Sequence, residues 1–163
     1  MTAATSTTTG LTPERLYRAL AIAEAITWTL LIAAMVLRYG AGQDWAVPIA
    51  GPIHGFVFLA YGAMQLVVGR NQRWRAGTIL VGIVTAVIPY ATIPWERRIA
   101  RRGLLAGGWR TEAGDDPRDA SAIDRLFRWA VRHPILTALV VLAVVAIVFA
   151  VLLQAGPPSE WFA

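Results

Sequence analysis

Four apolar stretches constrain this chain more than any other feature of its sequence. A helix needs roughly 20 predominantly apolar residues to cross the hydrocarbon core of a bilayer. We therefore predict an all-α membrane protein, a bundle of four transmembrane segments at about 16–37, 47–69, 76–95 and 134–154. The composition agrees, because 15% of the residues are charged, compared with roughly 25% in soluble domains.

Small and polar residues recur at helical spacing in the second and third stretches. Small residues let membrane helices approach closely, because van der Waals packing replaces the hydrophobic effect in lipid. We expect the first three segments, within residues 12–98, to form a three-helix core around a thin polar seam. The expected helix-packing positions are Gly51, Gly55, Gly62 and Gly82. The fourth segment has few such residues, so we expect it at the periphery or against another subunit.

Two ionisable residues lie deep in apolar stretches, Glu24 in the first and His54 in the second. Ionisable groups at membrane depth are costly and usually have a function. From the helix rise of about 1.5 Å per residue, we expect about 10 Å between Glu24 and His54 and two separate polar layers. The first layer holds Glu24, Tyr61 and Thr85, the second holds Trp28, His54 and Pro89, and Gln65 lies on the same stripe as His54 and Tyr61. Arg18 lies off this face and is expected to reach the lipid head groups.

Both buried residues have a structural interpretation beside a functional one. Glu24 is either a neutral carboxyl that fixes packing or a group that handles a proton, an ion or a substrate. His54 is either a neutral imidazole bonded to a backbone carbonyl or a member of the same site. We expect no metal and no cofactor, because the chain has no Cys and its only histidines are His54 and His133. Without paired acids or a Ser/His/Asp set, we also expect no enzyme.

The remaining segments are polar. We expect residues 1–11 to form a disordered tail and residues 155–163 a short polar tail. Residues 99–133 form an Arg-rich connection, in which Ala120–Arg132 predicts a short interfacial amphipathic helix. All fifteen basic residues are Arg, and they flank the apolar stretches, where they meet anionic lipid head groups. We therefore expect no nucleic-acid partner.

The Arg-rich loops conflict with four full spans. Short Arg-rich loops stay on the cytoplasmic side. Arg70, Arg73 and Arg75 precede the third segment, and nine arginines lie between Arg97 and Arg132 after it, so one full span would separate the two loops. Our preferred interpretation keeps a full, kinked third span. The alternative breaks it at residues 88–94 into a re-entrant hairpin that protein must bury.

Several short elements resemble one known family. They are Glu24, the stretch Gly51-Pro52-Ile53-His54-Gly55, the pair Ile88-Pro89 and the exit Trp95-Glu96-Arg97. These elements resemble the YdzA-like family of small bacterial integral membrane proteins of unknown function. The resemblance covers about residues 15–98. It implies a three-helix membrane module and supplies no activity.

Together these features favour a non-enzymatic, multi-pass protein of the cytoplasmic membrane. We expect an accessory or binding subunit whose partners are membrane lipids and either another membrane subunit or a second copy of the chain. The alternative is a small proton- or ion-coupled transporter or channel, which would have to act as an oligomer to build a pore.

Overall fold

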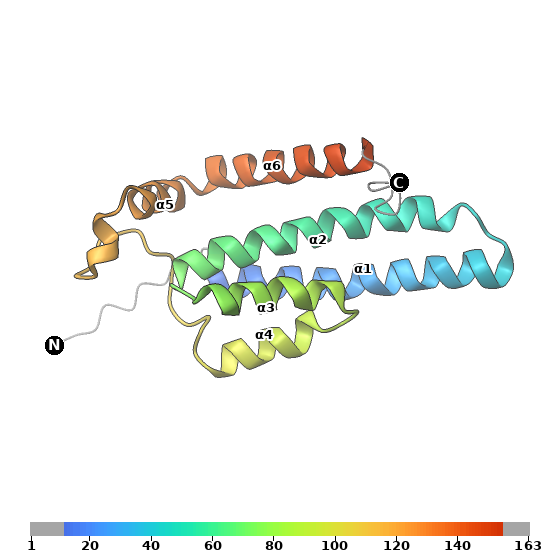
Figure 1. The fold of residues 1–163 in the computed structure, drawn as a ribbon, viewed down its shortest axis with the longest axis horizontal. Helices are drawn as coiled ribbons and strands as arrows, with labels where there is room; N and C mark the ends of the chain where they lie inside the picture. Colours follow the sequence, from blue (N-terminus) through green and yellow to red (C-terminus); the bar gives the residue numbers. More distant parts are fainter. Residues whose placement is uncertain (1–11, 155–163) are drawn as a thin grey trace.

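The computed structural model describes residues 12–154, which form six α-helices and one short 3-10 helix (Figure 1). The elements are α1 (Pro13–Ala41), α2 (Ala46–Asn71), α3 (Ala76–Val87), α4 (Thr92–Arg101), η1 (Pro117–Ala120), α5 (Ala122–Arg132) and α6 (Pro134–Gln154). Among them, α1, α2 and α6 are long and apolar enough to cross a membrane. The two tails expected at 1–11 and 155–163 lie outside the described residues.

The helices α1 and α2 form a long antiparallel pair. α1 begins after Thr12, whose side chain accepts a hydrogen bond of 3.2 Å from the amide of Arg15. It ends at Gly42, which adopts a φ of 65° and donates its amide to the carbonyl of Arg38. With 29 residues, α1 is about 43 Å long, more than the roughly 30 Å of a hydrocarbon core.

The third apolar stretch is not one helix, so the predicted full span at 76–95 is wrong. α3 ends at Val87, and α4 runs back alongside it to form a helical hairpin (Figure 1). Proline disfavours helical backbone at the preceding residue, and Ile88 before Pro89 is extended, with φ −102° and ψ 120°. Tyr90 then takes a φ of 64°, which reverses the chain. The alternative hairpin interpretation agrees with the structure.

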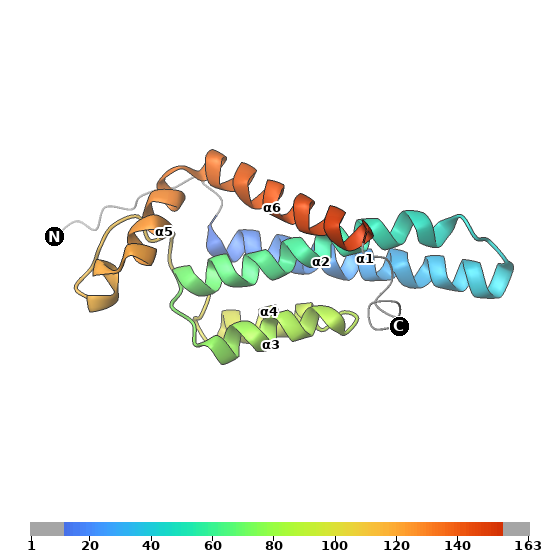
Figure 2. The same ribbon diagram turned by 45° about the horizontal axis from the view of Figure 1, so that its top comes forward.

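The hairpin covers only one part of the α1–α2 pair (Figures 1 and 2). We call this part the near end; it holds the start of α1, the end of α2 and both Arg-rich loops, whereas the far end holds the loop between α1 and α2. The main hydrophobic core lies at the near end, and its fully buried members include Tyr17, Ala21, Tyr61, Val68 and Ile99. A small cluster of Ala34, Ala46 and Ala50 joins α1 to α2 towards the far end.

α6 lies against α2 at the periphery, as expected for the fourth segment. Its described residues are almost all exposed, and only Val145 is buried. The contact with α2 is made by Phe149, whose ring lies 6.0 Å from that of Phe56 at 87°. An added Cβ at Gly55 would lie 3.3 Å from the Phe149 ring, so the two helices are close there.

α5 is amphipathic, and its polar side faces the protein. Asp124 and Arg128 are buried, whereas Ile123, Leu126 and Trp129 are exposed by 49% or more. A helix in water buries its apolar side, so this arrangement suits a helix that turns its apolar side to lipid at the membrane interface.

Candidate functional site

Glu24 and His54 lie together inside the α1–α2 pair. The Oε2 atom of Glu24 lies 3.9 Å from Nδ1 of His54, so the expected separation of about 10 Å is wrong. The error lies in the register of the two helices, because α1 extends past the start of α2 at the far end (Figure 1). This shift brings the two residues to one level.

The carboxylate of Glu24 is fully buried, and neither of its oxygens has a hydrogen-bond partner among the described residues. The hydroxyl of Thr27 lies 3.1 Å from Nδ1 of His54 and 3.1 Å from the carbonyl oxygen of Glu24. Because this hydroxyl has one hydrogen, the tautomer of His54 decides which of the two accepts it. Thr27 was not predicted, although it lies on the same helix face as Glu24.

Trp28 closes this group on the side of the hairpin. Its ring lies 4.4 Å from that of His54, and its indole N–H donates to the carbonyl of Ala86 over 3.1 Å. Pro89, which we expected in this layer, is instead exposed at the turn between α3 and α4. Pro89 has no amide hydrogen to donate to the carbonyl of Thr85, and this carbonyl accepts from the amide of Ile88 instead.

A second polar group lies closer to the near end. The hydroxyls of Tyr17 and Tyr61 are 3.1 Å apart, and Tyr61 lies 3.4 Å from Thr85 Oγ1. The amide of Gln65 donates to the Tyr17 hydroxyl. Tyr17, a residue that sequence reasoning missed, therefore joins Gln65 to Tyr61, and Tyr61 in turn contacts Thr85. The sequence signal for Tyr17 is its position seven residues, or about two helical turns, before Glu24, which places both residues on one face of the helix.

The predicted helix-packing glycines divide into three kinds. An added Cβ at Gly82 would collide with the side chain of Gln65, so Gly82 lies at a close contact in the seam. Gly55 faces α6, not the seam. Gly51 and Gly62 would meet no described atom within 4 Å, so neither lies at a helix contact. On α2 the glycine stripe and the polar stripe are neighbours, separated by about 100°.

Arg18 does not extend towards lipid as expected. Its Nε donates to Glu96 Oε1 over 2.9 Å, and its Nη2 donates to Glu14 over 2.8 Å. The side chain of Glu96 is 6% exposed, so this acid of α4 points inward. The hydroxyl of Thr92 also donates to the carbonyl of Ala21, over 3.2 Å. These contacts fasten α4 to α1.

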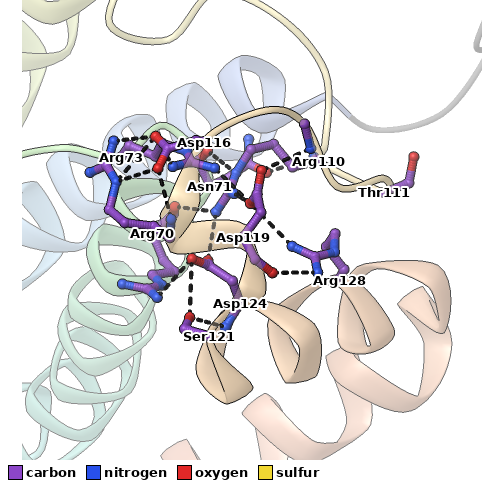
Figure 3. A network of polar contacts seen from close by, with 12 residues as sticks. Arg70, Asn71, Arg73, Arg110, Thr111, Asp116, Asp119, Ser121, Asp124 and Arg128 are labelled. Atoms are coloured by element: carbon purple, nitrogen blue, oxygen red, sulfur yellow. Dashed lines mark hydrogen bonds and ion pairs between the residues drawn. The ribbon is translucent and has the colours of Figure 1, made fainter.

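An Arg–Asp network joins the end of α2 to the long polar connection (Figure 3). At its centre, Asp119 binds three arginines, with 2.6 Å to Arg73, 3.0 Å to Arg110 and 3.1 Å to Arg128. Asp124 binds Arg110 at 3.1 Å and Arg70 at 3.2 Å. The sequence signal for this network is the run of acids within the Arg-rich connection, which we interpreted as a loop followed by an interfacial helix, with no ion pairs expected from it.

The Arg–Asp network holds both Arg-rich loops at the near end. The amide side chain of Asn71 adds bonds to the backbone of Gly108 and Arg110. Desolvation alone would raise the pKa of Asp124, but the hydrogen bond from Arg110 and the charges of Arg70 and Arg110 lower it overall. The apparent conflict between the loops therefore disappears, because the hairpin returns the chain to the same end.

Comparison with known proteins identifies the part of the chain that holds these groups. A family model described as "Domain of unknown function (DUF3817)" matches residues 14–101, more than half of the chain. The chain belongs to this family. The DUF3817 region runs from the start of α1 to the end of α4, so it contains the Glu24–His54 pair and the hairpin but neither α5 nor α6.

Two relatives are membrane proteins by name. SCO5905 of Streptomyces coelicolor is 37% identical over 97 residues, which are 56% of this chain and 12% of that protein. The uncharacterized membrane protein YdzA of Bacillus subtilis is 31% identical over 68 residues, 42% of this chain and 71% of YdzA. The predicted resemblance is thus confirmed, and the chain is a membrane protein of unknown function. No solved structure matches it.

Proposed function

We propose that the protein is a non-enzymatic accessory or binding subunit of the cytoplasmic membrane, which it crosses through α1, α2 and α6. The observation that carries this proposal is the partial cover that the hairpin gives to the α1–α2 pair. α3 has 12 residues and α1 has 29, or about 18 Å against about 43 Å. The far part of α1 therefore packs mainly against α2.

This far part offers a place for a partner helix. Large apolar side chains such as Leu30, Val36 and Ile49 are exposed there by 48%, 64% and 56%. Lipid covers such side chains as well as protein does, so exposure alone does not select a partner. On the α6 side of α2, however, Gly51 lies beyond the contact at Gly55 and has open space around it. Small residues of this kind admit a second helix at short distance.

The orientation follows from the near end. It carries both Arg-rich loops, and short Arg-rich loops stay in the cytoplasm. We therefore place the near end in the cytoplasm and the loop between α1 and α2 outside. With three crossings, both Arg-rich loops lie in the cytoplasm, whereas four crossings would put one of them outside.

A pair of matched glycine variants tests the accessory role. Gly51→Leu and Gly77→Leu both add a side chain where the chain has open space, the first on α2 at the far end and the second on α3 at the near end. Each tagged variant is expressed at low level and purified in native-lipid particles, and copurifying membrane proteins are quantified. We expect Gly51→Leu to lose the partner while Gly77→Leu retains it. A wild-type chain that purifies alone, as a monomer, would contradict the proposal.

The Glu24–His54 pair favours one other function, the coupled movement of protons or cations. A buried carboxylate with no hydrogen-bond partner, 3.9 Å from an imidazole, is a group that can gain and lose a charge. Flux of protons into reconstituted vesicles, compared between wild type and a folded Glu24→Gln variant, separates the two functions. We expect no flux in either protein. Wild-type flux that disappears in Glu24→Gln would replace the accessory role with transport.

A further inference from the structure

Three arginines of α4, together with Arg102 directly after it, line a shallow cavity on the surface of the near end. The cavity has a volume of about 450 Å³ and is lined by Pro94, Arg97, Arg98, Arg101 and Arg102. We call it the α4 arginine groove. All four arginines are exposed, and among the described residues none of their guanidinium groups has a hydrogen bond or an ion pair.

The positive charge of the groove is not neutralised because α4 turns its acidic side chain away from it. The acid of this helix, Glu96, points inward and is bound by Arg18. In the long connection, Asp119 and Asp124 bind Arg70, Arg73, Arg110 and Arg128. Four cations within six residues therefore face outward, and no acidic side chain of residues 12–154 forms an ion pair with them.

The hairpin sets the depth of the groove. α4 begins at the turn inside the membrane and returns to the near end, so its last residues lie level with the first residues of α3 (Figures 1 and 2). With a rise of about 1.5 Å per residue, Arg97 lies about 6 Å deeper than Arg101. Guanidinium groups spread over this range lie where phospholipid phosphates lie.

We propose that the α4 arginine groove binds the phosphate groups of an anionic phospholipid, with a preference for a head group that carries two phosphates. Guanidinium groups bind phosphate oxygens in bidentate fashion, which a lysine cannot do. Two pairs of arginines spaced by four residues, Arg97 with Arg101 and Arg98 with Arg102, provide for two phosphates. The lipid reaches the groove from the leaflet because all four arginine side chains are exposed on the surface of the hairpin.

The test compares two double variants of the full chain with equal loss of charge. Arg97→Gln/Arg101→Gln removes two groove cations, and Arg15→Gln/Arg125→Gln removes two exposed cations outside the groove. Binding to phosphatidylcholine nanodiscs that contain cardiolipin, or phosphatidylglycerol at equal charge, is followed by native mass spectrometry of the released protein–lipid complexes. We expect the groove variant to lose about thirtyfold in cardiolipin affinity, as expected from two lost contacts near the lipid surface, and the control about twofold or less.

A third variant checks the bidentate contact without changing charge. Arg98→Lys/Arg102→Lys should fold like the wild type and lose the preference for cardiolipin over phosphatidylglycerol. Equal losses in the groove and control variants would overturn the proposal, since attraction would then be unspecific. Inorganic pyrophosphate that displaces the lipid at equal concentration would overturn the assignment to lipid. An unchanged preference in the lysine variant would overturn the two-phosphate site.

Discussion

Arg18 of α1 binds Glu96 of α4 through an Nε–Oε1 contact of 2.9 Å, and this contact holds the returning arm of the hairpin against the first helix. The two residues lie 78 positions apart in the sequence. The carboxylate is 6% exposed and the guanidinium 50% exposed, so solvent screens the pair from one side only. The pair therefore matters more for the position of α4 than a surface ion pair would.

Replacing Arg18 should loosen α4. Arg18→Gln leaves the buried carboxylate of Glu96 without its partner, so we expect a loss of about 1–2 kcal/mol of stability after allowance for the exposed guanidinium. Arg18→Gln/Glu96→Gln should recover part of this loss, because no unpaired charge remains. Unfolding in detergent, analysed as a double-mutant cycle, measures the coupling. Glu14→Gln is the control and should change stability by less than about 0.5 kcal/mol; strict additivity of the two substitutions would contradict the pairing.

Glycines on α2 and α3 should respond in opposite ways to a methyl group. At Gly82 an added Cβ would collide with Gln65, so Gly82→Ala should cost about 1–3 kcal/mol. At Gly62 the added Cβ meets no described atom, and alanine favours the helix, so Gly62→Ala should be neutral or stabilise by up to about 1 kcal/mol. Thermal unfolding of both variants in the same detergent measures these two changes in stability. The same loss in both variants would show that Gly62 is packed after all.

Cysteine labelling should place residues 76 and 106 on one side of the membrane. The chain has no Cys, so single cysteines can replace the exposed residues Ala76, Ala106 and Gln43. An impermeant maleimide should label the first two from the cytoplasmic side and Gln43→Cys from the other. Labelling of positions 76 and 106 from opposite sides would mean that the third segment crosses fully.

Acid should weaken the Arg–Asp network. The pKa of Asp124 is lowered in the folded protein, so its ionised form stabilises the fold above the unfolded pKa of about 3.9, and this contribution is lost as the pH falls through the lower, folded value. The melting temperature of the wild type should therefore fall between about pH 5 and about pH 3. Asp124→Asn should be less stable at neutral pH and fall less over that interval. Parallel curves for the two proteins would exclude Asp124 as a source of the pH dependence.

The boundaries of the long helices could be predicted because apolar length is a local property. α2 and α6 lie within a few residues of the predicted spans, and the Thr12 cap of α1 has its own sequence signal. The break in the third stretch was less predictable, because proline inside a membrane helix usually gives only a kink. Here the choice between a kinked helix and a hairpin depends on Glu96 and Thr92. Their partners lie on α1, about seventy or more residues earlier in the sequence.

The candidate site was harder to predict because it depends on the register of two helices. Glu24, His54 and Trp28 were singled out from the sequence as members of a polar interior. Their distances could not follow from residue counting, since the loop after Ala41 lets α1 run past the start of α2 (Figure 1). The Arg–Asp network needs partners from α2, η1 and α5 at once, and no local pattern specifies such a combination.

The half-depth hairpin makes the protein wider at the near end than at the far end. At the near end α6 and both arms of the hairpin lie beside α1 and α2, whereas of the described helices only α1 and α2 continue to the far end (Figures 1 and 2). A wedge of this shape fits best where the lipids of the leaflet at the near end are already spread apart. The protein then does the least work against the lateral pressure of that leaflet. In the proposed orientation, we therefore expect membrane curvature to influence how this chain is distributed in the membrane.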